Sequence, residues 1–254
     1  MSIPQSIIAR KSFHSFNKKP VEGKLLDDLT DYLSELTPPY SELDWNFDTL
    51  PHSDLMQIAT RSYGIEAPTY LVLRSTKKAG CLQNMGYIGE MAILWLTEKG
   101  IATMWQGSVN VNSADDFPDS LPYITCIALG YSDEPFRKSA EESVRKPLKK
   151  IAYGALDGFE DYLESARLAP SYGNRQMTKI VCDKQGKIHL FRQKAMLNNP
   201  VLTYQDCVGV GASLAHLDFA MKADGITPRT YVIEPPPAFR EFIYQFSIDP
   251  MKNS

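Results

Sequence analysis

Residues 26–33 read Leu-Asp-Asp-Leu-Thr-Asp-Tyr-Leu, and residues 156–163 read Leu-Asp-Gly-Phe-Glu-Asp-Tyr-Leu. Leu, Asp, Asp, Tyr and Leu recur in register between these two segments. The apolar residues around the first copy fall at helical spacing on one face, so we predict that each copy sits in an amphipathic helix. Prolines follow at Pro38 and Pro170, and each is expected to end its helix.

A second pair of segments repeats in the same order. Residues 86–101 and 211–226 are apolar on nearly every side, and each ends with a glycine followed by an isoleucine. Helices of this kind are buried, and we expect the two to pack on each other within one chain. Candidate strands accompany these helices, at residues 69–73, 123–130 and 179–182.

Each half of the chain therefore reads as helix, strand, long buried helix and strand. This pattern predicts an α+β unit that is present twice, and chance similarity between ordinary helices is the alternative. We assign residues 1–140 to the first half and residues 141–254 to the second. The polar stretch 132–143 is the expected linker between them.

The composition argues against several classes of function. The chain has 254 residues and a net charge of −3 at pH 7, whereas nucleic-acid binders carry a basic face. The longest strongly apolar run, residues 91–96, is far too short to span a bilayer, and we read no signal peptide. The four cysteines form no Cys-x-x-Cys pair and the four histidines are scattered, so we expect free thiols, no metal site and a cytoplasmic location.

The first candidate site segment is residues 10–16. It places a guanidinium, an ammonium, a hydroxyl and an imidazole close together, from Arg10, Lys11, Ser12 and His14. A guanidinium binds phosphate through paired hydrogen bonds, and a serine hydroxyl adds a neutral one. A solvated basic stretch is the alternative interpretation.

Two further segments carry groups suited to a flat ligand. In the loop after the second amphipathic helix, hydroxyl and amide groups can satisfy the edge of a heterocycle, and a polar turn is the alternative. Near the first buried helix, a glycine lets the backbone approach a planar ligand, and two cations lie at the joint between the halves. These residues are Ser171, Asn174 and Gln176 in the loop, then Gln106 and Gly107, and then Arg145 and Lys146.

Other motifs point to structure rather than to catalysis. The chain contains no phosphate-binding loop with Gly-Lys-Ser/Thr, no Gly-x-Ser-x-Gly and no His-Glu-x-x-His. Gly209 and Gly211 lack the third glycine of a dinucleotide fingerprint, so close helix packing explains them better. We interpret His216 and Asp218, on the same helix, as a core or interface pair.

Together these segments resemble the FMN-dependent nitroreductase superfamily. The family's Arg-x-Ser-x-Arg-x-Phe phosphate segment is similar to residues 10–16, and its Ala-Pro-Ser-x-x-Asn-x-Gln-Pro-Trp ring loop is similar to residues 169–178. Residues 99–105, 128–131 and 145–148 resemble its Gly-Leu-Gly-x-x-Trp helix end, its strand ending in Gly-Tyr and its basic segment. The resemblance covers most of the chain.

The order of the motifs departs from the family pattern, because the ring loop occurs in the second half instead of early in the chain. Ordinary nitroreductases are homodimers with flavin at the interface, so a tandem duplication would let one chain imitate the dimer. The resemblance is therefore to single-chain nitroreductases with two structural repeats. It implies one FMN between the halves of a chain that is a monomer, or a dimer whose interface does not build the flavin site. We find no second basic segment after residues 235–237. His14 stands where the family has arginine, and Met177-Thr178 stands where it has Pro-Trp.

The resemblance implies an oxidoreductase that passes hydride from NAD(P)H through FMN to a small acceptor such as a nitroaromatic or quinone. Backbone N–H groups near residues 106 and 107 would face the reactive ring atom, and no side chain is assigned as a catalytic acid or base. The cofactor-binding residues it implies are Arg10, Lys11, Ser12, His14, Gln106, Gly107, Arg145, Lys146, Ser171, Asn174 and Gln176. A flavin-storage protein without catalysis and a relic without flavin are the alternatives.

Overall fold

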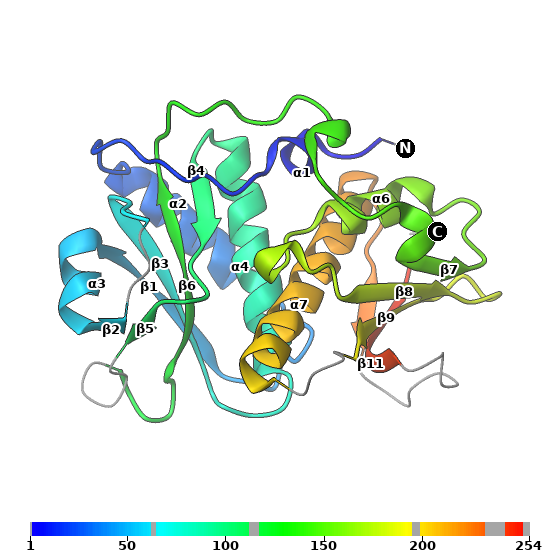
Figure 1. Cartoon of the computed structure of the whole chain (residues 1–254). Helices are drawn as coiled ribbons and strands as arrows, with labels where there is room; N and C mark the ends of the chain where they lie inside the picture. Colours follow the sequence, from blue (N-terminus) through cyan, green and yellow to red (C-terminus); the bar gives the residue numbers. More distant parts are fainter. Residues whose placement is uncertain (1, 62–64, 112–116, 195–198, 232–241, 251–254) are drawn as a thin grey trace.

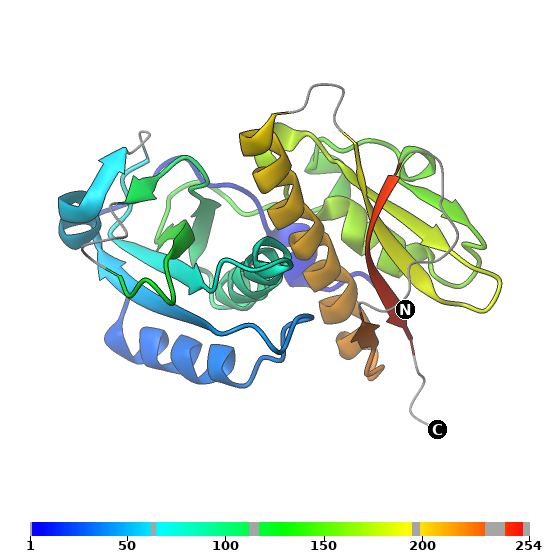
Figure 2. The same ribbon diagram turned by 90° about the horizontal axis from the view of Figure 1, so that it is seen from below.

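Two long helices form the centre of the molecule, and a sheet lies on the outer side of each (Figure 1). The computed structural model describes residues 2–61, 65–111, 117–194, 199–231 and 242–250. The central helices are α4 (Cys81–Glu98) and α7 (Pro200–Ala223), and they make the most extensive contact between any two elements. Figure 2 shows the same arrangement from below, with the two sheets separated by the helix pair.

The first half builds a four-stranded antiparallel sheet beside α4, in the order β1-β3-β6-β4. Helix α2 packs against α4. A short helix and a two-stranded ribbon extend this half at its outer end. The bounds are α2 Gly23–Ser34, β1 Trp45–Pro51, α3 His52–Ile58, β2 Ala59–Arg61, β3 Thr69–Ser75, β4 Ala102–Trp105, β5 Asn110–Val111 and β6 Tyr123–Gly130.

The second half builds a sheet beside α7 in the order β10-β11-β9-β8-β7, in which only the β7–β8 pair is parallel. Helix α6 packs against α7 as α2 packs against α4. The bounds are β7 Ala152–Gly154, α6 Glu160–Leu168, β8 Thr178–Cys182, β9 Ile188–Gln193, β10 Arg229–Tyr231 and β11 Phe242–Asp249. Three short 3₁₀ turns, η1 Ala140–Glu142, η2 Leu148–Lys150 and η3 Tyr172–Asn174, interrupt the connections.

The two halves share one topology. Each runs helix, two strands, long helix, two strands, and the sheet order β1-β3-β6-β4 corresponds position by position to β8-β9-β11-β10. This confirms the predicted α+β unit present twice. Strand β7, which precedes α6, is an addition at the edge of the second sheet. The predicted division at residue 140 stays a prediction.

The contact between α4 and α7 is reciprocal, as in a two-fold symmetric dimer. A Cβ atom on Gly86 of α4 would lie 2.0 Å from the carbonyl oxygen of Val208, and a Cβ on Gly211 of α7 would lie 2.0 Å from that of Gln83. Gly86 corresponds to Gly211, and Gln83 to Val208, at the same spacing of 125 residues. Only glycine permits this backbone approach, which confirms close helix packing as the role of Gly211.

Several elements differ from the sequence-based expectation. The second repeat copy is only partly helical, because Gly158 adopts a positive φ of 83° and α6 begins at Glu160. Each half contains four described strands for which no range was predicted; they are β1, β2, β4 and β5 in the first half and β7, β9, β10 and β11 in the second. The helices do end before their prolines, and Gly100 and Gly225 follow α4 and α7 with φ of 72° and 74°. The segment at residues 235–237 lies outside the described residues.

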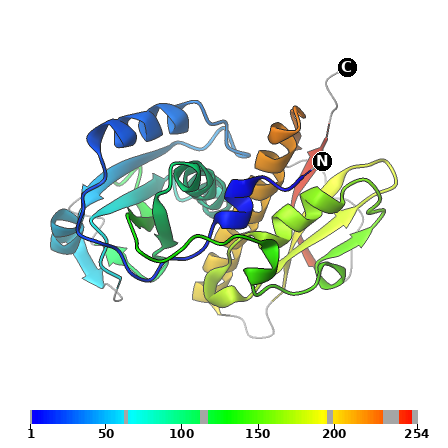
Figure 3. The same cartoon turned by 90° about the horizontal axis from the view of Figure 1, so that it is seen from above.

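The N-terminal segment binds the halves together. Helix α1 (Gln5–Ala9) contacts both α4 and α6, and the chain then runs beside β4 (Figure 3). The Phe13 N–H donates to the Thr103 carbonyl at 3.1 Å, and the Asn17 N–H donates to that of Tyr131 at 2.8 Å. None of the described helices combines the length and apolar character that a membrane crossing requires.

Candidate functional site

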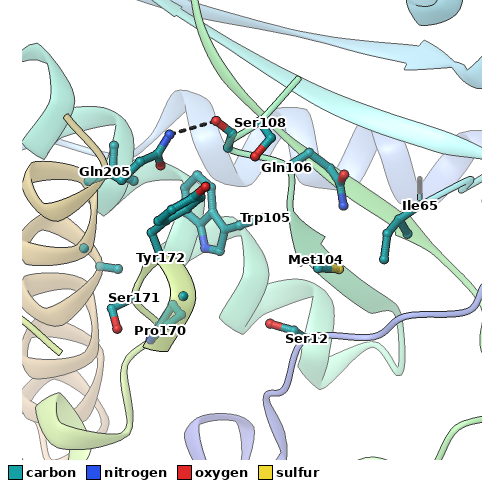
Figure 4. Close-up of a pocket in the computed structure, with 15 residues that line it drawn as sticks. Ser12, Ile65, Met104, Trp105, Gln106, Ser108, Pro170, Ser171, Tyr172 and Gln205 are labelled. Atoms are coloured by element: carbon teal, nitrogen blue, oxygen red, sulfur yellow. Dashed lines mark hydrogen bonds between the residues drawn. The ribbon is translucent and has the colours of Figure 1, made fainter. Parts of the chain in front are cut away.

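A cavity of about 280 Å³ lies between the two halves, beside the first turns of α7 (Figure 4). The first half contributes the N-terminal segment and the end of β4, and the second half contributes the loop after α6 and one face of α7. The lining residues are Ser12, Ile65, Met104, Trp105, Gln106, Gly107, Ser108, Pro170, Ser171, Tyr172, Gly173, Gln205, Val208, Gly209 and Ala212. This volume is close to the lower end of the range for small-molecule sites.

Gln106 provides the clearest sign of a ligand in this cavity. Its side chain is only 6 % exposed, and its Nε2 atom is buried without a hydrogen-bond partner among the described residues. A buried amide donor is costly when it is unpaired, so such a group calls for an acceptor from outside the chain. The backbone N–H of Gln106 already donates to the Cys126 carbonyl at 2.8 Å. The expectation is therefore wrong for the Gln106 N–H, and for the Gly107 N–H it stays a prediction.

Gly107 and Gln205 join the two halves at the wall of the cavity. The Gln205 Nε2 donates to the Gly107 carbonyl at 2.8 Å, as the dashed line in Figure 4 shows. A Cβ atom on Gly107 would lie 2.6 Å from the Gln205 Oε1. A larger residue at position 107 would displace the flexible end of the Gln205 side chain and weaken this contact between the turn after β4 and α7.

Arg10 lies next to this cavity but is itself buried in an ion pair. Its side chain is 2 % exposed, and its Nε lies 3.0 Å from the Oε1 of Glu90, which is fully buried on α4. At this distance the two opposite charges form a buried ion pair. Burial lowers the pKa of Arg10, and Glu90 partly offsets this effect.

Two further arginines complete a cationic group with Arg10. Arg137 donates through Nη1 to the Arg10 carbonyl at 2.6 Å. Burial first, and then the charges of Arg10 and Arg137, lower the pKa of Arg145 to about 10. Burial and Arg10 likewise lower the pKa of Arg137, with Glu142 acting in the opposite direction. Three half-buried or buried guanidinium groups that weaken one another form a site that an added anion would stabilise.

Glu90 connects the arginine group to the cavity wall and to the second half. Its Oε2 accepts a hydrogen bond from the Trp105 indole at 2.8 Å, and its Oε1 lies 3.0 Å from the His216 Nε2. Burial alone would raise the pKa of Glu90, but Arg10 and His216 hold it below its ordinary value. His216 also contacts the Ser165 carbonyl and is fully buried, which confirms its interpretation as a core residue.

The loop after α6 reaches the cavity with Ser171 but not with its two amides. Asn174 and Gln176 both have positive φ, at 55° and 53°. The Asn174 Oδ1 accepts from Arg145 at 3.0 Å, and the Gln176 Oε1 accepts from the Lys146 N–H at 2.6 Å. These side chains brace the basic segment from behind. Neither lines the cavity, which differs from the expected direct contact with a ring.

Three predicted residues have their side chains elsewhere. Lys11 pairs with Glu134 at 3.0 Å, and His14 is exposed while its backbone N–H donates to the same carboxylate at 2.9 Å. Lys146 directs its ammonium to the Arg175 carbonyl at 2.8 Å and lines a separate surface cavity. The structure therefore brings Ser12, Gln106, Gly107 and Ser171 to the cavity, with Arg10 and Arg145 beside it.

Four functional candidates were missed in the sequence. Arg137 lies within the stretch expected to be a linker, and its Nη1 contact with Arg10 spans 127 residues. Gln205 and Gly209 belong to no local pattern that marks a ligand, and Tyr172 stands at an unspecified position of the predicted ring loop, residues 169–178. Gly209 was attributed to helix packing, yet a Cβ there would have its nearest neighbour, the Ser171 Cβ, at 3.7 Å. Gly209 thus keeps one side of the cavity open.

The corresponding place on the other side of the helix pair is filled. At the spacing that relates Gly86 to Gly211, Asn84 corresponds to Gly209. Asn84 is fully buried; its Oδ1 accepts from the Tyr40 N–H at 2.9 Å and its Nδ2 donates to the Tyr40 carbonyl at 2.8 Å. A Cβ on Gly80 would lie 2.6 Å from the Tyr40 ring, which also contacts Phe246 edge-on.

The fold and the site together define a duplicated α+β protein with a cavity between its repeats. The chain belongs to the family described as "Putative TM nitroreductase", whose profile matches residues 2–221. No curated protein matches the chain. A solved structure from Thermotoga maritima MSB8, described as a "putative nitroreductase", has 20 % identity and a TM-score of 0.63, and the match covers 98 % of this chain and 93 % of that one.

Two further solved structures match about half of the chain. A nitroreductase family protein from Clostridium difficile 630 has 19 % identity and a TM-score of 0.49, over 57 % of this chain and 94 % of that one. A nitroreductase with bound FMN from Bacteroides fragilis NCTC 9343 has 18 % identity and a TM-score of 0.43, over 50 % and 87 %. The whole-length match from Thermotoga maritima supports the nitroreductase-like fold.

Proposed function

We propose that this chain is an FMN-dependent oxidoreductase that binds one FMN between its halves and passes hydride from NAD(P)H to a small electrophilic acceptor. The observation that carries the proposal is the buried, unpartnered Gln106 amide in a cavity beside three arginines. FMN combines a flat heterocycle having hydrogen-bond acceptors with a phosphate. The match to a nitroreductase family supports FMN as the cofactor.

The arginine group is suited to hold the phosphate. Arg137 and Arg145 are each only partly exposed, and Arg145 is anchored through its Nε and Nη2 to the Ala169 and Leu168 carbonyls at 3.2 Å. Those bonds satisfy the guanidinium without neutralising its charge. A phosphate would relieve the mutual repulsion and return the pKa of Arg145 toward its ordinary value. Ser12, two residues after Arg10, can add a neutral hydrogen bond.

The cavity between Gln106 and Ser171 is suited to the ring system. Gln106 Nε2 would donate to a ring acceptor, while Pro170, Val208 and Ala212 present apolar surface that excludes water. Trp105 is fixed by Glu90 and forms another part of the wall. FMN, when bound, supplies the hydride chemistry, and the residues of the chain bind, orient and shield it. No side chain is assigned as an acid or a base.

Tyr172 is suited to the approach of the acceptor. Its side chain is 41 % exposed and lines both the ligand cavity and a larger cavity next to it. The residues Met177-Thr178 occupy the family's Pro-Trp position, and the Thr178 hydroxyl accepts from Ser213 at 2.9 Å. NAD(P)H and the electron acceptor would therefore reach the ring one after the other, from the side of the cavity that Tyr172 lines.

The visible absorption spectrum of the purified protein tests this proposal. We expect flavin bands in the spectrum, bleaching when NADH or NADPH is added without oxygen, and recovery when a quinone or nitroaromatic follows. Bands that bleach only with dithionite would indicate a flavin-storage protein. A protein that remains colourless after incubation with FMN would contradict the proposal and leave a relic without flavin.

A further inference from the structure

A second, larger cavity opens directly from the ligand cavity and carries its own charge. It has a volume of about 1020 Å³ and shares Gly107, Ser108, Tyr172 and Gln205 with the smaller cavity. A molecule seated in it would therefore reach the same wall that a ligand of the smaller cavity touches. No function assigned so far uses the remainder of its surface.

The walls of this outer cavity are largely apolar. Leu82, Val109, Ile124 and Val201 line it, and Val201 is 64 % exposed although it is a large apolar residue. Two of its three tyrosines have occupied hydroxyls, because Tyr123 donates to the Val109 carbonyl at 3.0 Å and Tyr204 to the Ile124 carbonyl at 2.6 Å. These tyrosines thus present their rings instead of free polar groups.

The only charges on the described lining are two ammonium groups. Lys77 and Lys78 follow β3 and precede α4, and both are exposed. Neither makes an ion pair with any residue that the structure describes. Among the described lining residues there is no Asp or Glu. Apolar walls with two unneutralised cations favour a ligand that has an aromatic body and an anionic group.

We infer that the outer cavity selects an anionic aromatic acceptor, with its carboxylate or sulfonate at Lys77 and Lys78 and its ring directed toward Tyr172. This inference rests on the proposed function for the identity of the ligand as an electron acceptor. The binding part stands on the geometry alone. The cavity takes acidic aromatic molecules in preference to neutral ones of the same shape.

A pair of fluorescent probes tests the binding without any turnover. Anilinonaphthalene sulfonate is anionic, and N-phenyl-1-naphthylamine is its neutral counterpart. In the double variant Lys77→Gln/Lys78→Gln, the Kd of the sulfonate should rise about fivefold, the size expected for two solvent-accessible ion pairs. The Kd of the neutral probe should stay within about twofold. The variant Lys24→Gln/Lys184→Gln removes two exposed lysines outside the cavity and controls for net charge.

A substrate pair then tests the role in turnover. For 4-nitrobenzoate we expect KM to rise about fivefold in Lys77→Gln/Lys78→Gln with kcat retained. Both constants for methyl 4-nitrobenzoate should be the same in the variant and the unmodified protein, since the ester carries no charge for the lysines to bind. If neither compound is reduced by any form of the protein, the proposed oxidoreductase function fails while the probe result still decides the binding site.

Three results would overturn the inference. One is an equal loss of sulfonate binding in the control variant, which would indicate a general charge effect. Another is an equal weakening of neutral-probe binding in Lys77→Gln/Lys78→Gln, which would show that the lysines contact the aromatic body of the probes and not the sulfonate. The third is a rise in KM for NADPH with none for 4-nitrobenzoate, which would assign the lysines to the dinucleotide.

Discussion

The two sides of the α4–α7 pair occupy corresponding places in the two repeats, and they differ. On one side Gly209 faces Ser171 and leaves the ligand cavity open. On the other side Asn84 occupies the corresponding position and holds Tyr40 by two hydrogen bonds. The helix crossing itself has stayed symmetric at Gly86 and Gly211. A duplicated fold can thus keep the symmetric contact at its centre while the places on its two sides differ.

The crossing of α4 and α7 should lose similar stability when either of its two glycines is substituted. Gly86→Ala and Gly211→Ala each place a Cβ 2.0 Å from a backbone oxygen, so the helices must separate. We expect each variant to lose about 3 kcal/mol of unfolding free energy, measured by urea denaturation. Gly23→Ala, where a Cβ meets nothing within 4 Å, is the control and should change little. A large loss in only one of the two central variants would break the symmetry.

Substitutions at Gly209 and at Asn84, which occupy corresponding positions, should differ in their effect on FMN binding. Gly209→Asn places an amide between α7 and Ser171, and we expect it to weaken FMN binding about 100-fold because the cavity is overfilled. Asn84→Gly should leave FMN binding unchanged and cost about 2 kcal/mol of stability through two lost hydrogen bonds. Flavin fluorescence titration and denaturation measure the two effects. Equal weakening of FMN binding by both variants would show that the two sides are not functionally different.

The proposed phosphate-binding arginines give a further test of the side that contains Gly209. Arg137→Gln should weaken FMN binding about tenfold, since one charge-assisted contact contributes about 1.5–3 kcal/mol. Riboflavin, which lacks the phosphate, should bind the variant and the unmodified protein equally. Arg229→Gln, an exposed arginine on β10 of the other side, is the matched control. Arg137 is preferred to Arg10 because removal of Arg10 leaves the buried Glu90 without its partner and destabilises the fold.

Loss of the contacts between Glu134 and the N-terminal segment should give the smallest effect. The side chain of Lys11, aided by the backbone N–H groups of His14 and Ser15, lowers the pKa of Glu134 from 4.5 to about 2. Because the pKa of this carboxyl is lower in the folded state, the ionised carboxylate stabilises the fold at pH values above about 4.5. This contribution is lost as the pH falls from about 4.5 to 2. The variant Glu134→Gln should be less stable than the unmodified protein at pH 6 by under about 1 kcal/mol, and this difference should shrink by pH 3. A difference that grows toward pH 3 would contradict this account.

The sequence predicted the parts of the molecule that are encoded locally. The buried helices α4 and α7, their terminal glycines and the duplicated α+β unit all follow from periodicity and from repeated residues. Strand β1 alternates apolar and polar residues from Trp45 to Asp48, which is a strand pattern, but the predicted strands were all nearly continuous apolar runs and did not include it. Gly158 hid the true start of α6, since the apparent repeat continues across it.

The site was only partly predictable because its contacts are long-range. Ser12 and Ser171 were expected as ligands, and the fold places both at the cavity. Asn174 was expected at the ring but instead braces Arg145, which no local pattern reveals. Arg137 reaches Arg10 across 127 residues. The closure of the opposite side by Tyr40 likewise depends on a contact with Asn84, 44 residues away.

The central claim is that one side of the helix pair binds FMN and the other does not. The most direct test is to saturate the protein with FMN, isolate the monomer by size exclusion with light scattering, and count the flavin released by heat against protein. We predict one FMN per chain in a monomer of 28.6 kDa. Two FMN per chain would show that the Tyr40 side also binds, and none, or a flavin that needs two chains, would contradict the account.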